Sequence, residues 1–159
     1  MLASTMDADR FHLAQTNVAR ARAPMEHPQL ADFVRLLEPI NALADASPGF
    51  VWRLQTEEGD ATALRVFGQH DMLINMSVWE DVASLRAFVY QTQHLDVFKR
   101  RTEWFHPHVD AHLAMWWIPA GWIPTVGDAE ERVMHLRAHG PTPFAFTFTS
   151  VFEPTGAPA

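Results

Sequence analysis

Cysteine is absent from this chain of 159 residues. Its absence excludes disulfides, thiolate nucleophiles and Cys-ligated zinc or iron–sulfur sites. Basic residues are also few, since 12 Lys and Arg stand against 19 Asp and Glu and the net charge is -7. Binding to nucleic acid needs clustered Lys and Arg, and the only basic run is KRR at 99–101. We therefore expect no nucleic-acid partner.

Long apolar runs are missing as well. No stretch approaches the roughly 20 apolar residues that a membrane span needs. The first residues, MLASTMDADR, lack the charged start and apolar core of a signal peptide. We expect a cytoplasmic protein without a membrane partner. The sequence also lacks a G-x-S-x-G nucleophile motif and a phosphate-binding loop.

Aromatic residues are plentiful. Apolar residues make up 48% of the chain and charged residues 19%, with six Trp and eleven Phe. This composition is typical of a globular protein, and the length suits one domain. We predict a single domain over residues 10–152, with flexible tails at 1–9 and 153–159.

Two periodicities alternate along the chain. Alternation with a period of two predicts strands at 11–18, 50–54, 71–79, 112–119 and 144–152. Helical spacing predicts helices at 29–46, with a kink or break at Pro39, at 81–105 and at 127–140. This order predicts an α+β fold, a ferredoxin-like antiparallel sheet with helices on one face and an added helix and strand.

The second face of such a sheet needs a cover. Trp116 and Trp117 are neighbours in one predicted strand, so they point to opposite faces and both faces are aromatic. An exposed aromatic face would form a larger apolar patch than monomers normally carry. We expect a homodimer of facing sheets, although a long loop folded over the sheet would serve the same purpose.

Seven segments, in order along the chain, are LAQTN, NALADASPGFVWRL, NMSVWED, FVYQTQH, RRTEWF, MWWIPAGWIPT and HGPTPFAFTF. Together, over residues 11–149, they resemble the bacterial family catalogued as domain of unknown function 3291. The fold of that family is similar to the dimeric α/β barrels of antibiotic-biosynthesis monooxygenases, which implies a ligand cavity between the sheet and its covering helices. Members often have His after the Gly of WW-x-P-x-G, where this chain has Trp122. Chemistry that needs an imidazole at that position is therefore not expected.

The segment FVYQTQHLDVFKRRTEWF carries the main candidates for catalysis. Helical spacing puts Tyr90, His94, Val97, Arg101 and Trp104 on one stripe. In the functional interpretation, Tyr90 and His94 point into the cavity, and Arg101 and Trp104 lie near its mouth. In the structural interpretation, these side chains fill the core and satisfy backbone groups. We expect the stripe to face a ligand cavity, because a core rarely buries several polar groups without water or ligand.

Polar residues of two strands are candidates for ligand binding. Asn17 shares one face of its strand with Gln15, and Asn75 shares one face of its strand with Ser77. These groups either converge on a polar ligand or bond one another as a structural network.

The remaining candidates are one arginine and four tryptophans. Arg53 is interpreted either as a clamp for a carboxylate or enolate, or as a salt-bridge partner of an acid such as Glu103. The indoles expected to wall the cavity belong to Trp52, Trp79, Trp104 and Trp116.

Histidines occur at spacings that resemble those of metal ligands, namely His106-x-His108-x3-His112 and His135-x3-His139. No acid or Cys completes a tetrahedral set, so we interpret them as surface histidines and expect no metal site. No cofactor is expected either. Haem at His94 is the alternative, without a supporting haem motif.

Three functions remain open. The first is a cofactor-independent monooxygenase, or a related enzyme, that acts on a small aromatic or polyketide-like molecule, with His94 as base and Tyr90, Asn17 or Asn75 holding the oxyanion. The second is a non-catalytic protein that binds a hydrophobic metabolite or haem. The third is a structural dimer with a filled core.

Overall fold

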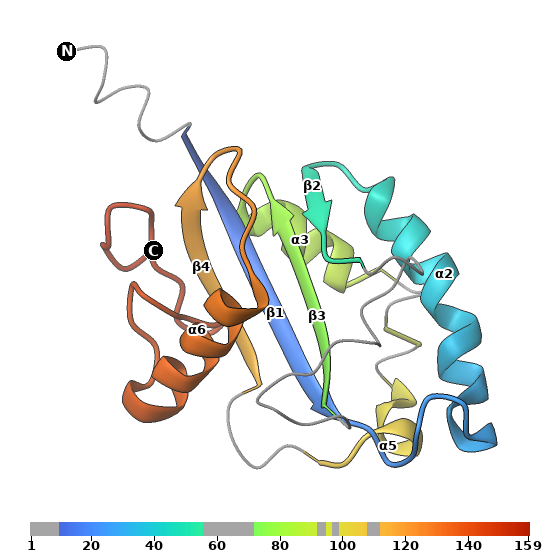
Figure 1. Cartoon of the computed structure of the whole chain (residues 1–159). Coiled ribbons are helices and arrows are strands. Elements are labelled where there is room, and N and C mark those ends of the chain that lie inside the picture. The colour runs from blue at the N-terminus through green and yellow to red at the C-terminus, as the bar shows by residue number, and fades with distance from the viewer. Residues whose placement is uncertain (1–9, 56–71, 92–94, 97–98, 108–111) are drawn as a thin grey trace.

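The computed structural model describes residues 10–55, 72–91, 95–96, 99–107 and 112–159. Its four strands are β1 (Phe11–Arg20), β2 (Phe50–Arg53), β3 (Met72–Trp79) and β4 (Leu113–Pro119). They form one antiparallel sheet in the order β2-β3-β1-β4 (Figure 1). The predicted α+β class with a ferredoxin-like antiparallel sheet is confirmed.

The register of the sheet separates odd and even residues. Leu13 pairs with Trp79 and with Trp117, while Ala14 pairs with Val78 and with Trp116. Because successive side chains of a strand point to opposite faces, the odd residues of β1, β3 and β4 share one face and the even residues share the other. We call these the odd face and the even face.

Two helices cover the odd face. A 3₁₀ turn (Pro28–Leu30) leads into α2 (Ala31–Asp45), and α3 (Val82–Val89) follows an N-cap in which the side chain of Asp81 accepts from the amide of Ser84. Leu85 and Phe88 of α3 are buried with Trp79 of the sheet. Pro39 lies within α2 and does not end it.

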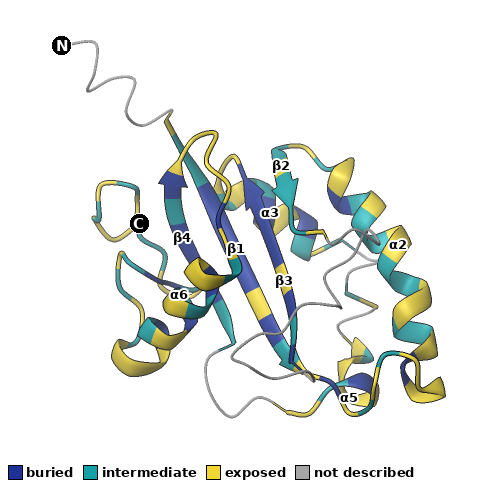
Figure 2. Ribbon diagram, viewed as in Figure 1, coloured by how far each residue is buried: buried dark blue, intermediate teal, exposed yellow. Residues whose placement is uncertain are grey.

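The even face is covered by a third helix of the same chain, α6 (Val126–His139). Its buried residues Ala129, Val133 and Leu136 belong to the same core cluster as Trp116, which is 1% exposed (Figure 2). Helices therefore lie on both faces, and the cover that we expected from a partner's sheet comes from the chain itself. On the odd face, the indole of Trp117 donates to the carbonyl of Phe152.

The long helix predicted from Asp81 to residue 105 is wrong. The helix α3 ends at Val89, with Tyr90 as C-cap, and α5 (Arg101–Trp104) is a separate short helix. Most helical stability comes from burying an apolar face. The apolar stripe of α3 ends near Phe88, and the polar residues 91–94 (QTQH) do not continue it.

The strand predicted at 144–152 is also wrong. Thr142 bridges Ala145 and Thr147 bridges Ser150, so two tight turns redirect this segment. The segment contacts β4 through one isolated bridge between Met115 and Phe146. The residues expected as a tail continue to make backbone contacts, because the amide of Ala159 donates to the carbonyl oxygen of Val151 at 2.9 Å. No helix in the described part of the chain is long and apolar enough to cross a membrane.

Candidate functional site

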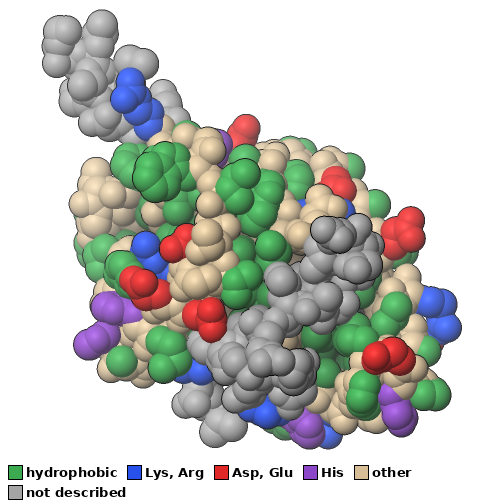
Figure 3. All heavy atoms as spheres, viewed as in Figure 1, with side chains coloured by type: hydrophobic (Ala, Val, Ile, Leu, Met, Phe, Trp, Pro, Cys, Tyr) green, Lys and Arg blue, Asp and Glu red, His purple; other side chains and the backbone are tan. Residues whose placement is uncertain are grey.

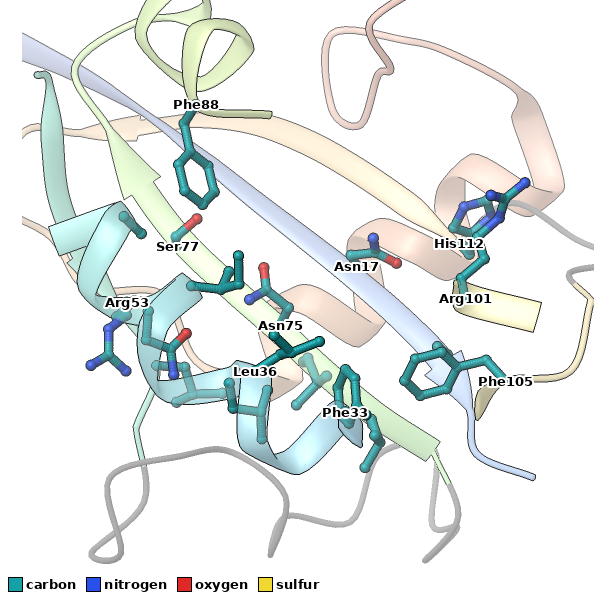
Figure 4. Close-up of a pocket in the computed structure, with 18 of the residues that line it drawn as sticks. Asn17, Phe33, Leu36, Arg53, Asn75, Ser77, Phe88, Arg101, Phe105 and His112 are labelled. Carbon is teal, nitrogen blue, oxygen red and sulfur yellow. The ribbon is translucent and has the colours of Figure 1, made fainter. Parts of the chain in front are cut away.

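A cavity of about 560 Å³ lies between the odd face of the sheet and the helices that cover it (Figure 4). Its lining comes from β1, β2, β3, α2, α3, α5 and the segment that precedes β4. The volume is in the range of small-molecule sites.

The helix α2 supplies the apolar wall. Phe33, Leu36, Leu37 and Ile40 recur at spacings of three and four, so they lie on one side of the helix and border the cavity. They are half-buried, because they face a cavity rather than a filled core. From α3, the buried ring of Phe88 closes the wall beside Trp79.

The floor of the cavity is a hydrogen-bonded polar network on β1 and β3. Gln15 lies opposite Ser77 in the register, and Asn17 lies opposite Asn75. The amide nitrogen of Gln15 donates to Asn75 Oδ1 and to Ser77 Oγ, both at 2.7 Å. The indole of Trp79 donates to the same Ser77 oxygen at 2.8 Å. Gln15 and Ser77 are buried, whereas the side chain of Asn75 reaches the open space.

Three elements meet at one end of the cavity. Asn17 comes from β1, Arg101 comes from α5, and His112 directly precedes β4 (Figure 4). The amide of Val18 donates to the carbonyl of His112 at 3.0 Å, which ties this segment to β1. This end carries a guanidinium, an imidazole and an amide.

Arg53 lines the cavity from β2. It forms an ion pair with Asp45, the last residue of α2, with 2.8 Å between Arg53 Nε and Asp45 Oδ1. The salt bridge that we considered with Glu103 is therefore made with Asp45 instead, because Asp45 lies beside β2 and Glu103 lies in α5.

The short helix α5 is held by contacts outside the cavity. Arg100 forms ion pairs with Asp32 of α2 and with Glu103, each at 2.8 Å. The hydrogen bond from Arg100 lowers the pKa of the Glu103 carboxyl, and the same bond raises the pKa of Arg100. The amide of Arg22 donates to the carbonyl of Trp104 at 2.8 Å. These contacts fix the backbone that carries Arg101.

Half of the predicted site residues border the cavity, namely Asn17, Arg53, Asn75, Trp79 and Arg101. Four of them lie on β1, β2 and β3, and the pairing of these strands brings the four together. Arg101 comes from α5.

Of the other five predicted residues, His94 lies outside the described residues, and the remaining four are not part of the described lining. Tyr90 is 62% exposed, because α3 ends before it. Trp104 is 1% exposed and packs against Phe33 rather than facing the cavity. Trp52 and Trp116 lie on the even face, so neither can wall a cavity on the odd face.

Sequence reasoning missed two parts of the lining. His112 was interpreted as a surface histidine, yet it borders the cavity together with His106. The apolar stripe of α2 was recognised as helical, but the sequence held no signal that Phe33 and Ile40 face a cavity. The pairing of β4 with the Asn17 segment would have pointed to His112, and that pairing is a property of the folded sheet.

Among the described residues, no three His, Asp or Glu side chains are arranged to share a metal ion. His108, which belongs to one predicted histidine cluster, lies outside these residues. His135 and His139 lie on α6, outside the cavity lining, with their rings tilted to each other and the ring centroids 4.4 Å apart.

The family model of DUF3291, described as a domain of unknown function, matches residues 12–159. No curated protein matches the chain.

Several solved structures are similar. SnoaB, a cofactor-independent oxygenase from Streptomyces nogalater, has 18% identity and a TM-score of 0.46, over 70% of this chain and 95% of that chain. A candidate antibiotic biosynthesis monooxygenase from Nitrosomonas europaea has 8% identity and a TM-score of 0.47, over 74% and 96%. A conserved protein from Methanosarcina mazei has 10% identity and a TM-score of 0.48, over 71% and 96%. Similarities this distant transfer no reaction to the chain, so its function has to be argued from its own cavity.

Proposed function

This chain belongs to the DUF3291 family, a domain of unknown function. We propose its function from the residues that line the cavity on the odd face of the sheet. It binds a small aromatic or polyketide-like molecule that can form an enolate or phenolate, and it oxygenates that molecule with dioxygen and without a cofactor.

The charge of the cavity lining supports this proposal. Arg53, Arg101, His106 and His112 border the cavity, and no Asp or Glu is among the described residues that line it. Arg53 is paired with Asp45, so Arg101 and the two histidines are the other basic groups of a described lining that contains no acid, in a chain whose net charge is -7. A cavity with apolar walls and basic groups favours a ligand that has an apolar body and an anionic oxygen.

The polar groups suit a reaction that begins with removal of a proton. In this mechanism His112 is the base that takes a proton from a CH₂ group whose carbanion is conjugated with the carbonyl of the substrate. The amide of Asn75 and the hydroxyl of Ser77 stabilise the resulting enolate oxygen, and the apolar wall of α2 keeps water away. The carbanion then reacts with dioxygen. Overall, one CH₂ group and one O₂ give one C=O group and one water, so no external electron donor is consumed.

The test uses 1,8-dihydroxyanthrone as substrate in an oxygen electrode, because its central CH₂ group lies across the ring from its carbonyl and the carbanion is conjugated with that carbonyl through the aromatic rings. We expect His112→Asn to lower kcat about 100-fold or more, the usual contribution of a general base. The dissociation constant should stay within about threefold. His135→Asn on α6 is the matched control, because His135 lies outside the cavity lining.

The outcomes separate the candidate functions. Binding of the anthrone without enhanced oxygen uptake would favour the non-catalytic alternative, a protein that binds a hydrophobic metabolite. Absence of binding would contradict the proposal as a whole.

We also propose that the protein forms a homodimer, although by a different surface from the one first expected. The even face is covered by α6, but Trp122 and Ile123 in the loop before α6 are 67% and 61% exposed. Figure 3 shows apolar side chains gathered on the face of the molecule that carries α6. Neighbouring large apolar side chains that are this exposed are typical of an interface, and a second copy of the chain is the proposed occupant.

A further inference from the structure

We propose that Gln15 is a positioning residue that makes the cavity floor a donor of hydrogen bonds, so that the site selects ligands by an acceptor oxygen. This inference rests on the proposed binding function and adds the residue that sets its selectivity. Gln15 is only 5% exposed and is not among the residues that line the cavity, so it acts through its two partners.

The geometry uses both hydrogens of the Gln15 amide nitrogen. One points to Asn75 Oδ1 and the other to Ser77 Oγ, each at 2.7 Å. A side-chain amide nitrogen has two hydrogens and no acceptor site. Both partners must therefore accept, which fixes the orientation of each.

For Asn75, acceptance at Oδ1 determines which end of its amide is left for the cavity. The oxygen is held toward Gln15, so the nitrogen with its two hydrogens is the end available to a ligand. Figure 4 shows Asn75 and Ser77 neighbouring each other in the cavity.

The Ser77 hydroxyl oxygen accepts from a second donor besides Gln15. The indole of Trp79 can only donate, and it donates to Ser77 Oγ at 2.8 Å. With Gln15 also donating, both lone pairs of the hydroxyl oxygen are occupied. The hydroxyl hydrogen remains to be donated, and Ser77 borders the cavity. A ligand oxygen thus meets donors from Asn75 and Ser77, which are two positions apart in β3 and therefore share one face.

A single substitution at Gln15 should change the cavity floor from a hydrogen-bond donor to a hydrogen-bond acceptor. If an acceptor occupied the position of the Gln15 nitrogen, Asn75 and Ser77 would donate to it, and the Asn75 oxygen would turn toward the cavity. Glu has the shape of Gln and, as a carboxylate, offers only acceptors. Gln15→Glu should therefore invert the hydrogen-bond polarity of the floor with little change in its shape.

Three tricyclic probes of matched shape measure this polarity. Fluorenone carries only an acceptor, carbazole carries only an N–H donor, and fluorene carries neither. In the wild-type protein we expect fluorenone to bind about tenfold more tightly than carbazole, the effect of about one well-made hydrogen bond. In Gln15→Glu the order should reverse, while the affinity for fluorene stays within about threefold. A purely structural role of Gln15 would change the affinities for all three probes together.

Gln15→Met is the second variant, since it keeps the length of the side chain without a polar group. It should bring the ratio of the fluorenone and carbazole affinities close to one, and it supplies the test where Gln15→Glu does not fold. An unchanged ratio in the folded variants, or a wild-type preference for carbazole, overturns the role of Gln15 while the proposed binding function stands. Failure of all three probes to bind the wild-type protein overturns both.

Discussion

Single side chains of this protein combine packing with polar roles, and Trp79 is the clearest case. Its indole is fully buried, stacks on Phe88 with ring centroids 5.2 Å apart, and meets Phe50 edge to face. Its Nε1 also donates to Ser77, which borders the cavity. The residue therefore belongs both to the core of the odd face and to the network of the floor.

Trp79→Phe should separate these two roles. Phe keeps most of the ring contacts but has no donor, so one lone pair of the buried Ser77 oxygen loses its partner, and the smaller ring leaves space. We expect a loss of about 2 to 3 kcal/mol in the free energy of unfolding in urea titrations. Fluorenone should also bind less tightly, because the Ser77 hydroxyl can reorient.

Trp116→Phe is the control for that prediction. Trp116 is equally buried but lies on the even face, against α6. The Trp116→Phe variant should have a lower free energy of unfolding than the wild-type protein and the same affinity for fluorenone. An equal change in affinity for both variants would show that the effect is not specific to the floor of the cavity.

Among the elements, α6 is the helix that covers the even face, so the sheet has helices on both faces and not on one. It begins with a capping box, in which the side chain of Thr125 accepts from the amide of Asp128 and the Asp128 carboxylate accepts from the amide of Thr125. Arg132 lies above the ring of Phe144 at 3.7 Å and donates to its carbonyl oxygen. Burial lowers the pKa of Arg132, and the interaction with Glu131 opposes this shift.

Thr125→Ala removes the side-chain half of the capping box. We expect the free energy of unfolding to fall by about 1 kcal/mol, the usual value for an N-cap. Thr149→Ala, in the exposed turn at 147–150, should change it by less than about 0.5 kcal/mol. The free energies of unfolding are measured by urea denaturation. If Thr125→Ala lowers this free energy no more than Thr149→Ala does, the prediction that the cap stabilises α6 is wrong.

Considered as a whole, the molecule has a net charge of -7, whereas the described lining of its cavity contains no Asp or Glu. Acidic side chains are spread over the face shown in Figure 3, whereas two arginines line the cavity, Arg53 and Arg101. The largest exposed apolar side chain is that of Trp122. The proposed dimer would bury that side chain.

Trp122→Asp should therefore shift the proposed dimer to a monomer of 18.0 kDa in sedimentation at micromolar concentration. A charge in the centre of an apolar contact is unfavourable unless it is paired. Val34→Asp on α2 is the control, since Val34 is 42% exposed on a helix that covers the odd face of the sheet. A wild-type protein that sediments only as the 18.0 kDa species would count against the dimer.

The amino-acid sequence by itself determined the local features of this protein. Alternation with a period of two located four strands to within two residues and placed Asn17 and Gln15 on one face of β1. Helical spacing located α2 and α6 equally well. These features depend on the periodicity of neighbouring residues, which any window of the sequence contains. Four of the predicted site residues, Asn17, Arg53, Asn75 and Trp79, follow from the strand pattern, because a strand fixes which side chains share its face.

Only the tertiary structure decided which of these faces encloses the site. Alternation separates Trp52 and Trp116 from Arg53 and Met115, but it does not tell which face α2 and α3 cover. The same holds for His112, which joins Asn17 through the long-range pairing of β1 with β4. The end of α3 before Tyr90 and the cover provided by α6 also depend on what each segment packs against. Burial against distant segments is a property of the folded chain, whereas periodicity is local.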